Sequence, residues 1–183
     1  MNLLNITEAP AENLAGLDNI VYIGLVADAA SIPVKHAVDV LLDPTVWVNL
    51  ATPPVMKTGK KMVSIRVTPD SIKFDADGQG ELDGKSIKNK LEFSIPGLTD
   101  ENLALVSATN NADLFFIFSH NGQYHLMGNK ERPANAESPK GTSGGKATDG
   151  KKITYSFSQD WSTPAPIITL TTANIEALLL PAI

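Results

Sequence analysis

Several segments of the chain alternate between apolar and polar residues, as β-strands with one buried face do. Residues 61–68 (KMVSIRVT) and residues 86–95 (SIKNKLEFSI) are the clearest of these segments. Residues 75–84 (DADGQGELDG) lie between them and form a polar, glycine-rich stretch that predicts a hairpin turn. Further short strands are predicted at residues 46–48, 71–74, 153–157 and 167–171.

The chain is expected to be organised around a hairpin over residues 112–129. Residues 114–118 (LFFIF) and residues 124–127 (YHLM) flank the turn sequence Ser-His-Asn-Gly. Asn121-Gly122 supplies residues that tolerate a positive φ, which tight hairpin turns require. Because residues 114–118 are apolar at every position, both faces of this strand are expected to be buried, in the middle of a sheet.

A second continuous apolar run, Ile20–Val26 (IVYIGLV), predicts another buried strand. Gly24 inside this run indicates a bulge or a close approach of another group to the backbone. Residues 28–44 give an ambiguous prediction. Their apolar residues have roughly helical spacing, whereas Pro33 and many β-branched residues disfavour a helix.

Two helices are predicted, one inside the chain and one near its C-terminal end. The first starts at Thr99, whose side chain can cap free amides, and Asp100 and Glu101 suit the positive end of the helix dipole. Leu103, Leu105 and Val106 are expected to form its apolar face, and residues 110–111 to end it. The second helix is predicted over residues 172–180, next to a threonine cap.

Two polar stretches complete the predicted architecture. Residues 1–19 predict a flexible N-terminal arm, and residues 130–152 predict a long polar loop whose prolines and glycines break helices and strands. Many short strands with one internal and one C-terminal helix favour a mainly β fold, a β-sandwich or barrel, over alternating βαβ units. We therefore expect residues 1–183 to form a single β-rich domain.

Composition narrows the class of protein without identifying a function. Apolar residues make up 43% of the chain and charged residues 19%, as in ordinary soluble proteins. The net charge of −5 disfavours a free nucleic-acid binder. The chain has no cysteine, so disulfides, thiolate metal sites and cysteine nucleophiles are excluded. Neither a signal peptide nor an apolar run of membrane-spanning length is found, so synthesis in the cytoplasm is expected.

Two patterns raise the question of a metal site. Residues 75–83 place oxygen-bearing side chains at alternate positions with a glycine sixth, as calcium loops do, but Ser86 stands where such loops have a glutamate. A solvated turn is the favoured interpretation, and cation binding there stays open. His120 and His125 flank the central hairpin turn, yet neither they nor His36 come with a marked third ligand for zinc.

Other polar motifs also favour structural roles. Ser119-His120 lacks a glycine-flanked nucleophile elbow, and residues 141–146 (GTSGGK) lack the spacing of a phosphate-binding loop. Lys57, Lys60 and Lys61 are interpreted as a solvated cluster, and Trp47 and Trp161 as packing residues. We therefore expect no catalytic residue, no cofactor and no enzymatic activity.

The C-terminal half carries a series of strand and turn motifs: DLFFIFS, NGQYHLMGN, GGKATDGKKITYSFS and STPAPII. This series resembles a family of small virion proteins of tailed phages, in particular tail-tube-like structural proteins from phages of Bacteroidetes-type hosts. The N-terminal half adds no recognisable motif. The residues that match the family pattern are Leu126, Gly128, Gly145, Lys146, Asp149, Gly150, Pro164, Ala165 and Pro166.

The resemblance implies a β-sandwich or barrel with a flanking helix that assembles into hexameric rings, which stack into a tube in the virion. It implies no catalysis and no cofactor. An acidic lumen would let DNA pass without binding, because like charges repel. The loop over residues 131–151 would act as an arm that reaches a neighbouring subunit. Its expected subunit-interface residues are Arg132, Pro139, Lys140 and Lys146.

Two alternatives stay open at this point. The chain could be another virion component of similar fold, such as a neck, head-completion or tail-terminator protein. It could also be a β-sandwich binding module for a carbohydrate or a host receptor, with Trp47, Trp161 and Tyr124 as stacking residues. Exposed aromatic side chains would favour this second alternative, and buried ones would weaken it.

Overall fold

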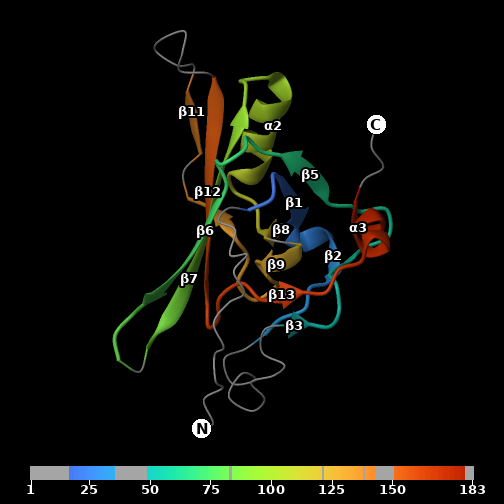
Figure 1. The fold of residues 1–183 in the computed structure, drawn as a ribbon, viewed down its shortest axis with the longest axis vertical. Helices are drawn as coiled ribbons and strands as arrows, with labels where there is room; N and C mark the ends of the chain where they lie inside the picture. Colours follow the sequence, from blue (N-terminus) through green and yellow to red (C-terminus); the bar gives the residue numbers. More distant parts are fainter. Residues whose placement is uncertain are drawn as a thin grey trace.

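Two β-sheets face each other across a hydrophobic core, and a helix lies against the far side of one of them (Figure 1). This computed structural model describes residues 17–35, 49–82, 84–120, 122–137, 139–142 and 151–179. The predicted strand at residues 46–48 and most of the predicted N-terminal arm lie outside the described residues. The mainly β fold with a sandwich arrangement, one internal helix and a C-terminal helix is confirmed.

The first sheet has the strand order β3-β13-β9-β8-β1-β5. Neighbouring strands are antiparallel, except that β13 and β3 are parallel. Strands β8 and β9 form the predicted central hairpin. The strands of this sheet are β1 (Ile20–Leu25), β3 (Asn49–Leu50), β5 (Val63–Arg66), β8 (Leu114–His120), β9 (Gln123–Met127) and β13 (Ile167–Ile168).

The second sheet has the order β10-β12-β7-β6, and β11 also pairs with β12. Its strands are all antiparallel. The hairpin of β6 and β7 extends away from the rest of the molecule (Figure 1). The strands of this sheet are β6 (Lys73–Gln79), β7 (Ser86–Pro96), β10 (Asn135–Ala136), β11 (Lys140–Thr142) and β12 (Lys152–Trp161).

The central strand β8 is buried on both faces, as its uninterrupted apolar sequence predicts. Leu114, Phe116 and Phe118 point into the core between the two sheets. Phe115 and Ile117 point into a second core on the outer face of the first sheet. Full burial of each large side chain stabilises the fold by about 1.5–3 kcal/mol, so this strand contributes to both cores.

Smaller elements cover the second core. The two-stranded sheet of β2 (Ala29–Ser31) and β4 (Val55–Met56) supplies Ala29 and Met56, and helix α3 (Thr172–Leu178) supplies Leu178. A short 3-10 helix, η1 (Val26–Asp28), connects β1 to β2. Within the described part of residues 28–44, residues 29–31 therefore form a strand, and no α-helix occurs in residues 28–35.

Both helices begin at the predicted threonine caps. The Asn102 N–H donates to the Thr99 hydroxyl oxygen at the start of α2 (Asp100–Thr109), and the Asn174 N–H donates to that of Thr171 at the start of α3. The apolar face predicted for α2 is only partly right. Leu105 and Val106 pack against the main core, whereas Leu103 is 47% exposed.

The predicted turn over residues 75–84 is too long. Strand β6 continues through Asp75 and Asp77 to Gln79, so only residues 80–85 connect the two strands. Opposite each aspartate lies a lysine of β7, with Asp75 facing Lys90 and Asp77 facing Lys88. Opposite charges at facing positions favour an antiparallel ladder, so the register accommodates acidic residues in this strand.

The predicted polar loop over residues 130–152 is also partly wrong. Strands β10 and β11 lie inside it and pair with β12, whose backbone offers hydrogen-bond partners along this edge. Ala134 is fully buried and exchanges backbone hydrogen bonds of 2.8 and 3.0 Å with Leu114. Small residues suffice here because the backbone makes the contacts. Residues 143–150 lie outside the described residues.

The alternation expected over residues 61–68 fails at its start. Ile65 and Val67 enter the main core as expected, but Val63, on the same face, is 45% exposed because β5 is the edge strand. Met62 faces the opposite side and is buried in the second core. The outer face of this strand is therefore not solvated along its whole length.

Candidate functional site

Two surface grooves and one charged sheet face are the candidate functional surfaces of the described residues. The first groove, here the tyrosine groove, lies on the outer face of the first sheet and has a volume of about 330 Å³. Tyr22 of β1 and Tyr124 of β9 are both half-buried in it. The groove is lined by Asp18, Asn19, Ile20, Tyr22, Arg66, Ser119 and Tyr124.

The two tyrosines of this groove interact electrostatically. Burial raises the pKa of Tyr22, and the nearby Tyr124 and Asp18 raise it further. The Tyr22 hydroxyl is therefore neutral at physiological pH and can donate or accept hydrogen bonds. Partly exposed rings beside Arg66 and Asp18 form a surface that could stack on a planar or sugar ring and hydrogen-bond its edge.

The second groove, here the lysine groove, lies between strand β4 and helix α3 and has a volume of about 350 Å³. Its apolar wall is formed by Pro53, Pro54, Val55 and Met56, and α3 contributes Ala177 and Leu178. Val55 is 51% exposed. Lys57, Lys60 and Lys61 lie around this apolar wall, so the predicted lysine cluster borders a groove.

Each lysine of the groove also holds the local fold together. Lys57 Nζ donates to the Ala27 carbonyl at 2.6 Å, and Lys60 forms a 3.2 Å ion pair with Asp28. Lys61 Nζ donates to the carbonyl of Ala177 near the C-terminal end of α3, where the helix dipole favours a cation. Among the described residues, only the ammonium group of Lys60 is paired with a carboxylate, so the described lining of the groove is rich in positive charge.

On the outer face of the second sheet, three lysines are paired with carboxylates. Lys73 lies 2.7 Å from Asp75, Lys88 lies 2.5 Å from Glu137, and Lys90 lies 2.8 Å from Glu92. The hydrogen bond from Lys88 lowers the pKa of Glu137, so this carboxylate stays charged at physiological pH.

The candidate calcium loop is not formed. Asp75 and Asp77 lie in a regular strand, Asp75 pairs with Lys73, and Asp83 lies outside the described residues. No group of three histidine or acidic side chains suited to a metal ion occurs among the residues that the structure describes.

His125 is a core-edge residue in the structure. Its ring stacks on Phe118 at a centroid distance of 5.5 Å, and its Nδ1 lies 3.2 Å from the Ala165 carbonyl oxygen. Burial lowers its pKa, so the imidazole is neutral at pH 7. His120 faces the same side of the hairpin, because His120 pairs with Gln123 and His125 with Phe118. His36 lies outside the described residues.

The tryptophans expected to pack are only partly described. Trp161 ends β12 and is half-buried, and its indole N–H donates to the Lys35 carbonyl at 2.7 Å. This bond favours the packing role over a stacking platform. Trp47 lies outside the described residues. Ser119 is buried beside the tyrosine groove.

The predicted subunit-interface residues lie at different places on the fold. Arg132 and Lys140 are exposed, Lys140 in β11, and Pro139 is half-buried. The backbone carbonyl of Arg132 accepts hydrogen bonds from the Asn129 N–H and from Gln159 Nε2. Lys146 lies outside the described residues. Their role in subunit contacts stays a prediction.

Two of the motifs that carry the family resemblance are structural anchors. Gly128 has a φ of +93°, and a Cβ there would lie 2.5 Å from the Leu114 carbonyl oxygen. The Ala165 N–H donates to the buried Asn89 side chain, and its carbonyl contacts His125. These residues hold the two sheets together, so a structural role accounts for both motifs and no bound ligand is needed.

Comparisons of the chain with protein-family models, with curated proteins and with solved structures find no match. Within the described residues, the helices are all too short or too polar to cross a membrane. The resemblance to tail-tube-like proteins thus rests on the sequence motifs alone, and the function below is proposed on physical grounds.

Sequence reasoning missed both grooves as sites. Tyr22 lies inside an apolar run that predicts a fully buried strand, yet the position opposite it on edge strand β5 is Ser64, which leaves the Tyr22 ring partly exposed.

Leu82 is the most exposed large apolar residue of the described chain, at 84%. The only signal for it was an isolated leucine in an otherwise polar turn.

Proposed function

We propose that this protein is a structural subunit of a tailed-phage virion, namely a tail-tube subunit that assembles into stacked rings around a DNA conduit. The sequence motifs suggest this role, and one structural observation carries it. Strand β6 ends the second sheet, so its outer backbone edge has no strand partner among the described residues. An open edge is a template for pairing with another chain.

The side chains of β6 make such pairing selective. Lys73, Asp75 and Asp77 place one positive and two negative charges along this edge. Charged residues on an edge strand oppose indiscriminate aggregation, so they favour a partner strand with a complementary pattern. A second copy of this chain, presented in a fixed ring geometry, is the partner that the proposal requires.

The charge pattern of the second sheet is compatible with a conduit for DNA. Lys73, Lys88 and Lys90 are each neutralised by a carboxylate of the same face. Because capture of phosphates depends on cations that are free to displace counterions, paired lysines bind DNA weakly. The partners proposed are therefore further copies and other virion proteins, with no enzymatic step. The site of action is the virion, after synthesis in the host cytoplasm.

The test is negative-stain electron microscopy of the purified chain over a concentration series, with the mass in solution measured by light scattering. Rings or hollow tubes that grow with concentration are expected. A monomer at every concentration would overturn self-assembly by this chain alone. A neck, head-completion or terminator protein, which needs a different partner, would then replace the tube subunit.

The tyrosine groove favours a second candidate, a β-sandwich module that binds a carbohydrate or a host receptor. Tyr124 is half-buried beside Tyr22 and Arg66, so it stays available as a stacking residue, whereas the indole of Trp161 is held by Lys35. A monomer whose tyrosine fluorescence is quenched by a glycan would support this candidate over the tube.

A further inference from the structure

The tip of the β6–β7 hairpin, residues 80–85, presents an isolated apolar side chain at one end of the molecule. Leu82 is 84% exposed in this tip. Gly80 has a φ of +94°, and the Gly84 N–H donates to the Glu81 carbonyl at 3.1 Å, so the turn is closed by its own backbone. A leucine held out on a closed turn cannot fold back onto its own core, so it suits a contact with another molecule.

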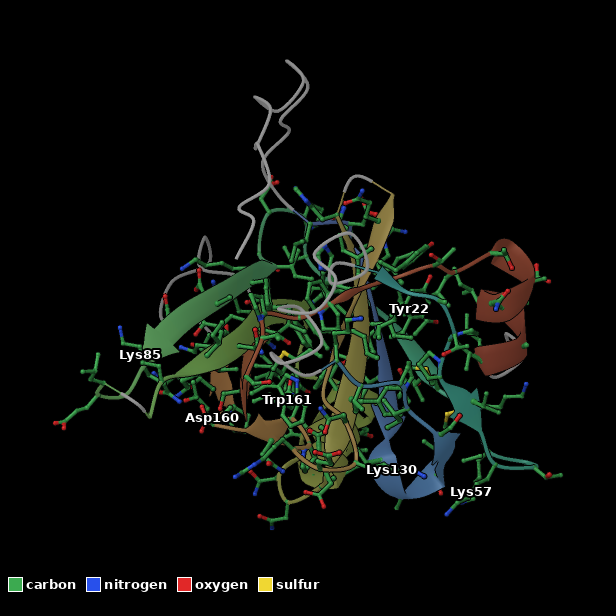
Figure 2. All side chains as sticks on the ribbon, turned by 90° about the horizontal axis from the view of Figure 1, so that it is seen from below. Tyr22, Lys57, Lys85, Lys130, Asp160 and Trp161 are labelled. Atoms are coloured by element: carbon green, nitrogen blue, oxygen red, sulfur yellow. The ribbon has the colours of Figure 1, made fainter. Side chains whose placement is uncertain are left out.

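The lysine groove lies at the opposite end. Figure 2 shows Lys85 of the hairpin tip at one extreme of the molecule and Lys57 of the groove at the other. The groove offers the apolar wall of Pro53, Pro54 and Val55, with three lysines around it and no acidic residue among its described lining. An apolar side chain carried by an acidic segment would be complementary to such a surface.

The hairpin tip meets both requirements. Leu82 is preceded by the exposed Glu81 and followed in the sequence by Asp83. The tip is also held at its base, because Gln79 Nε2 donates to Asp160 Oδ1 at 2.7 Å and to Ser86 Oγ at 3.2 Å. Little conformational freedom would therefore be lost when the tip binds.

We propose that Leu82 of one copy inserts into the lysine groove of the next copy, with Glu81 against its lysines. This inference rests on the proposed self-assembly and specifies the contact between neighbouring copies. Because tip and groove lie at opposite ends of one chain, the contact is head-to-tail and builds a closed ring or an open filament, not a two-fold dimer.

The absence of cysteine from the chain allows a direct test. The double variant Leu82→Cys/Val55→Cys, oxidised under assembly conditions, is expected to form a ladder of disulfide-linked oligomers. The control Leu82→Cys/Leu103→Cys has a comparably exposed second site on α2. It should give no species larger than a linked dimer. A second variant, Leu82→Asp, should raise the concentration needed for assembly by about tenfold or more.

The outcomes separate the two proposals. A ladder from the tip–groove pair alone supports the contact. Rings or tubes without a ladder, which also persist in Leu82→Asp, overturn the contact and leave self-assembly standing. A monomer in electron microscopy together with no ladder overturns both. Circular dichroism of each variant should match the parent chain, since Leu82 and Val55 are exposed.

Discussion

Gly24 shows how closely one residue can be constrained by its neighbour. It lies on β1 opposite Phe115 of β8, and a Cβ built on it would be only 2.4 Å from the Phe115 ring. Phe115 is fully buried in the second core and cannot move aside freely. The glycine is therefore required by this close approach, as its place inside an apolar strand predicted.

We expect Gly24→Ala to lower the free energy of unfolding by about 1–3 kcal/mol, because overpacking forces the ring or the backbone to shift. Urea unfolding followed by circular dichroism would measure it. Gly78→Ala is the matched control in β6, since no atom lies within 4 Å of a Cβ there. Its effect should stay within about 0.5 kcal/mol. Equal unfolding midpoints for the two variants would show that the close contact with Phe115 does not restrict the residue at position 24.

At the residue scale, local chemistry was predictable and exposure was not. Thr99 was recognised as a helix cap because its partner lies three residues away in the chain. The apolar pattern places Leu103 and the valine at position 63 on buried faces, yet both side chains are about half exposed. Their exposure depends on the edge position of β5 and on the docking of α2, which no local pattern encodes.

At the scale of elements, one buried polar side chain links β7 to the loop that follows β12. Asn89 is fully buried, its Nδ2 donates to the Thr163 carbonyl, and its Oδ1 accepts from the Ala165 N–H, both at 3.1 Å. Gln159 does the same for the loop after β9, since it accepts from the Gly128 N–H and donates to the Arg132 carbonyl. Both loops are thus held by side chains of the second sheet.

Asn89→Ala is expected to cost about 1–3 kcal/mol of unfolding free energy, because it leaves two buried backbone groups without partners. Asn135→Ala removes a comparable side chain from an exposed position, so it should cost less than about 0.5 kcal/mol. The diagnostic measurement is amide exchange at Ala165, which should accelerate in Asn89→Ala alone. Unchanged exchange there would mean that the loop is held by other contacts.

Strand existence was easier to predict than strand ends. The strands β1, β7, β8 and β12 follow from apolar runs or clean alternation. Strand β6 was cut short because Asp75 and Asp77 are typical of turns, and their lysine partners on β7 become visible only once the register is known. β10 and β11 were missed since their sequences are polar and small, and pairing with β12 decides their conformation.

At the scale of the whole molecule, neither groove could have been predicted. The lysine groove joins residues 53–61 to the C-terminal helix, and the tyrosine groove joins β1, β5 and β9. Such surfaces arise from the order of strands in a sheet, and strand order is set by long-range pairing. The same topology places the hairpin tip and the lysine groove at opposite ends (Figure 2).

The two cores are expected to open in separate steps, because β8 divides them and α3 covers only the outer one. When α3 undocks, Leu178 loses its core contacts and the hydrogen bond from the Met62 N–H to the Leu178 carbonyl breaks. The contacts of Leu91 in the main core stay intact. Leu91→Ala should therefore accelerate amide exchange in β7, β8 and β12, by a factor matching its destabilisation of about 2–5 kcal/mol.

The amides of Met62, Ile175 and Leu179, which are hydrogen-bonded around α3, should keep their parent exchange rates in Leu91→Ala. Leu178→Ala is the matched variant in the second core, and it should accelerate both sets, because global unfolding exposes Leu178 as well. If the α3 amides instead accelerate as much as those of β7 in Leu91→Ala, the helix and the sandwich unfold as one unit. Native-state hydrogen exchange followed by nuclear magnetic resonance resolves these amides individually.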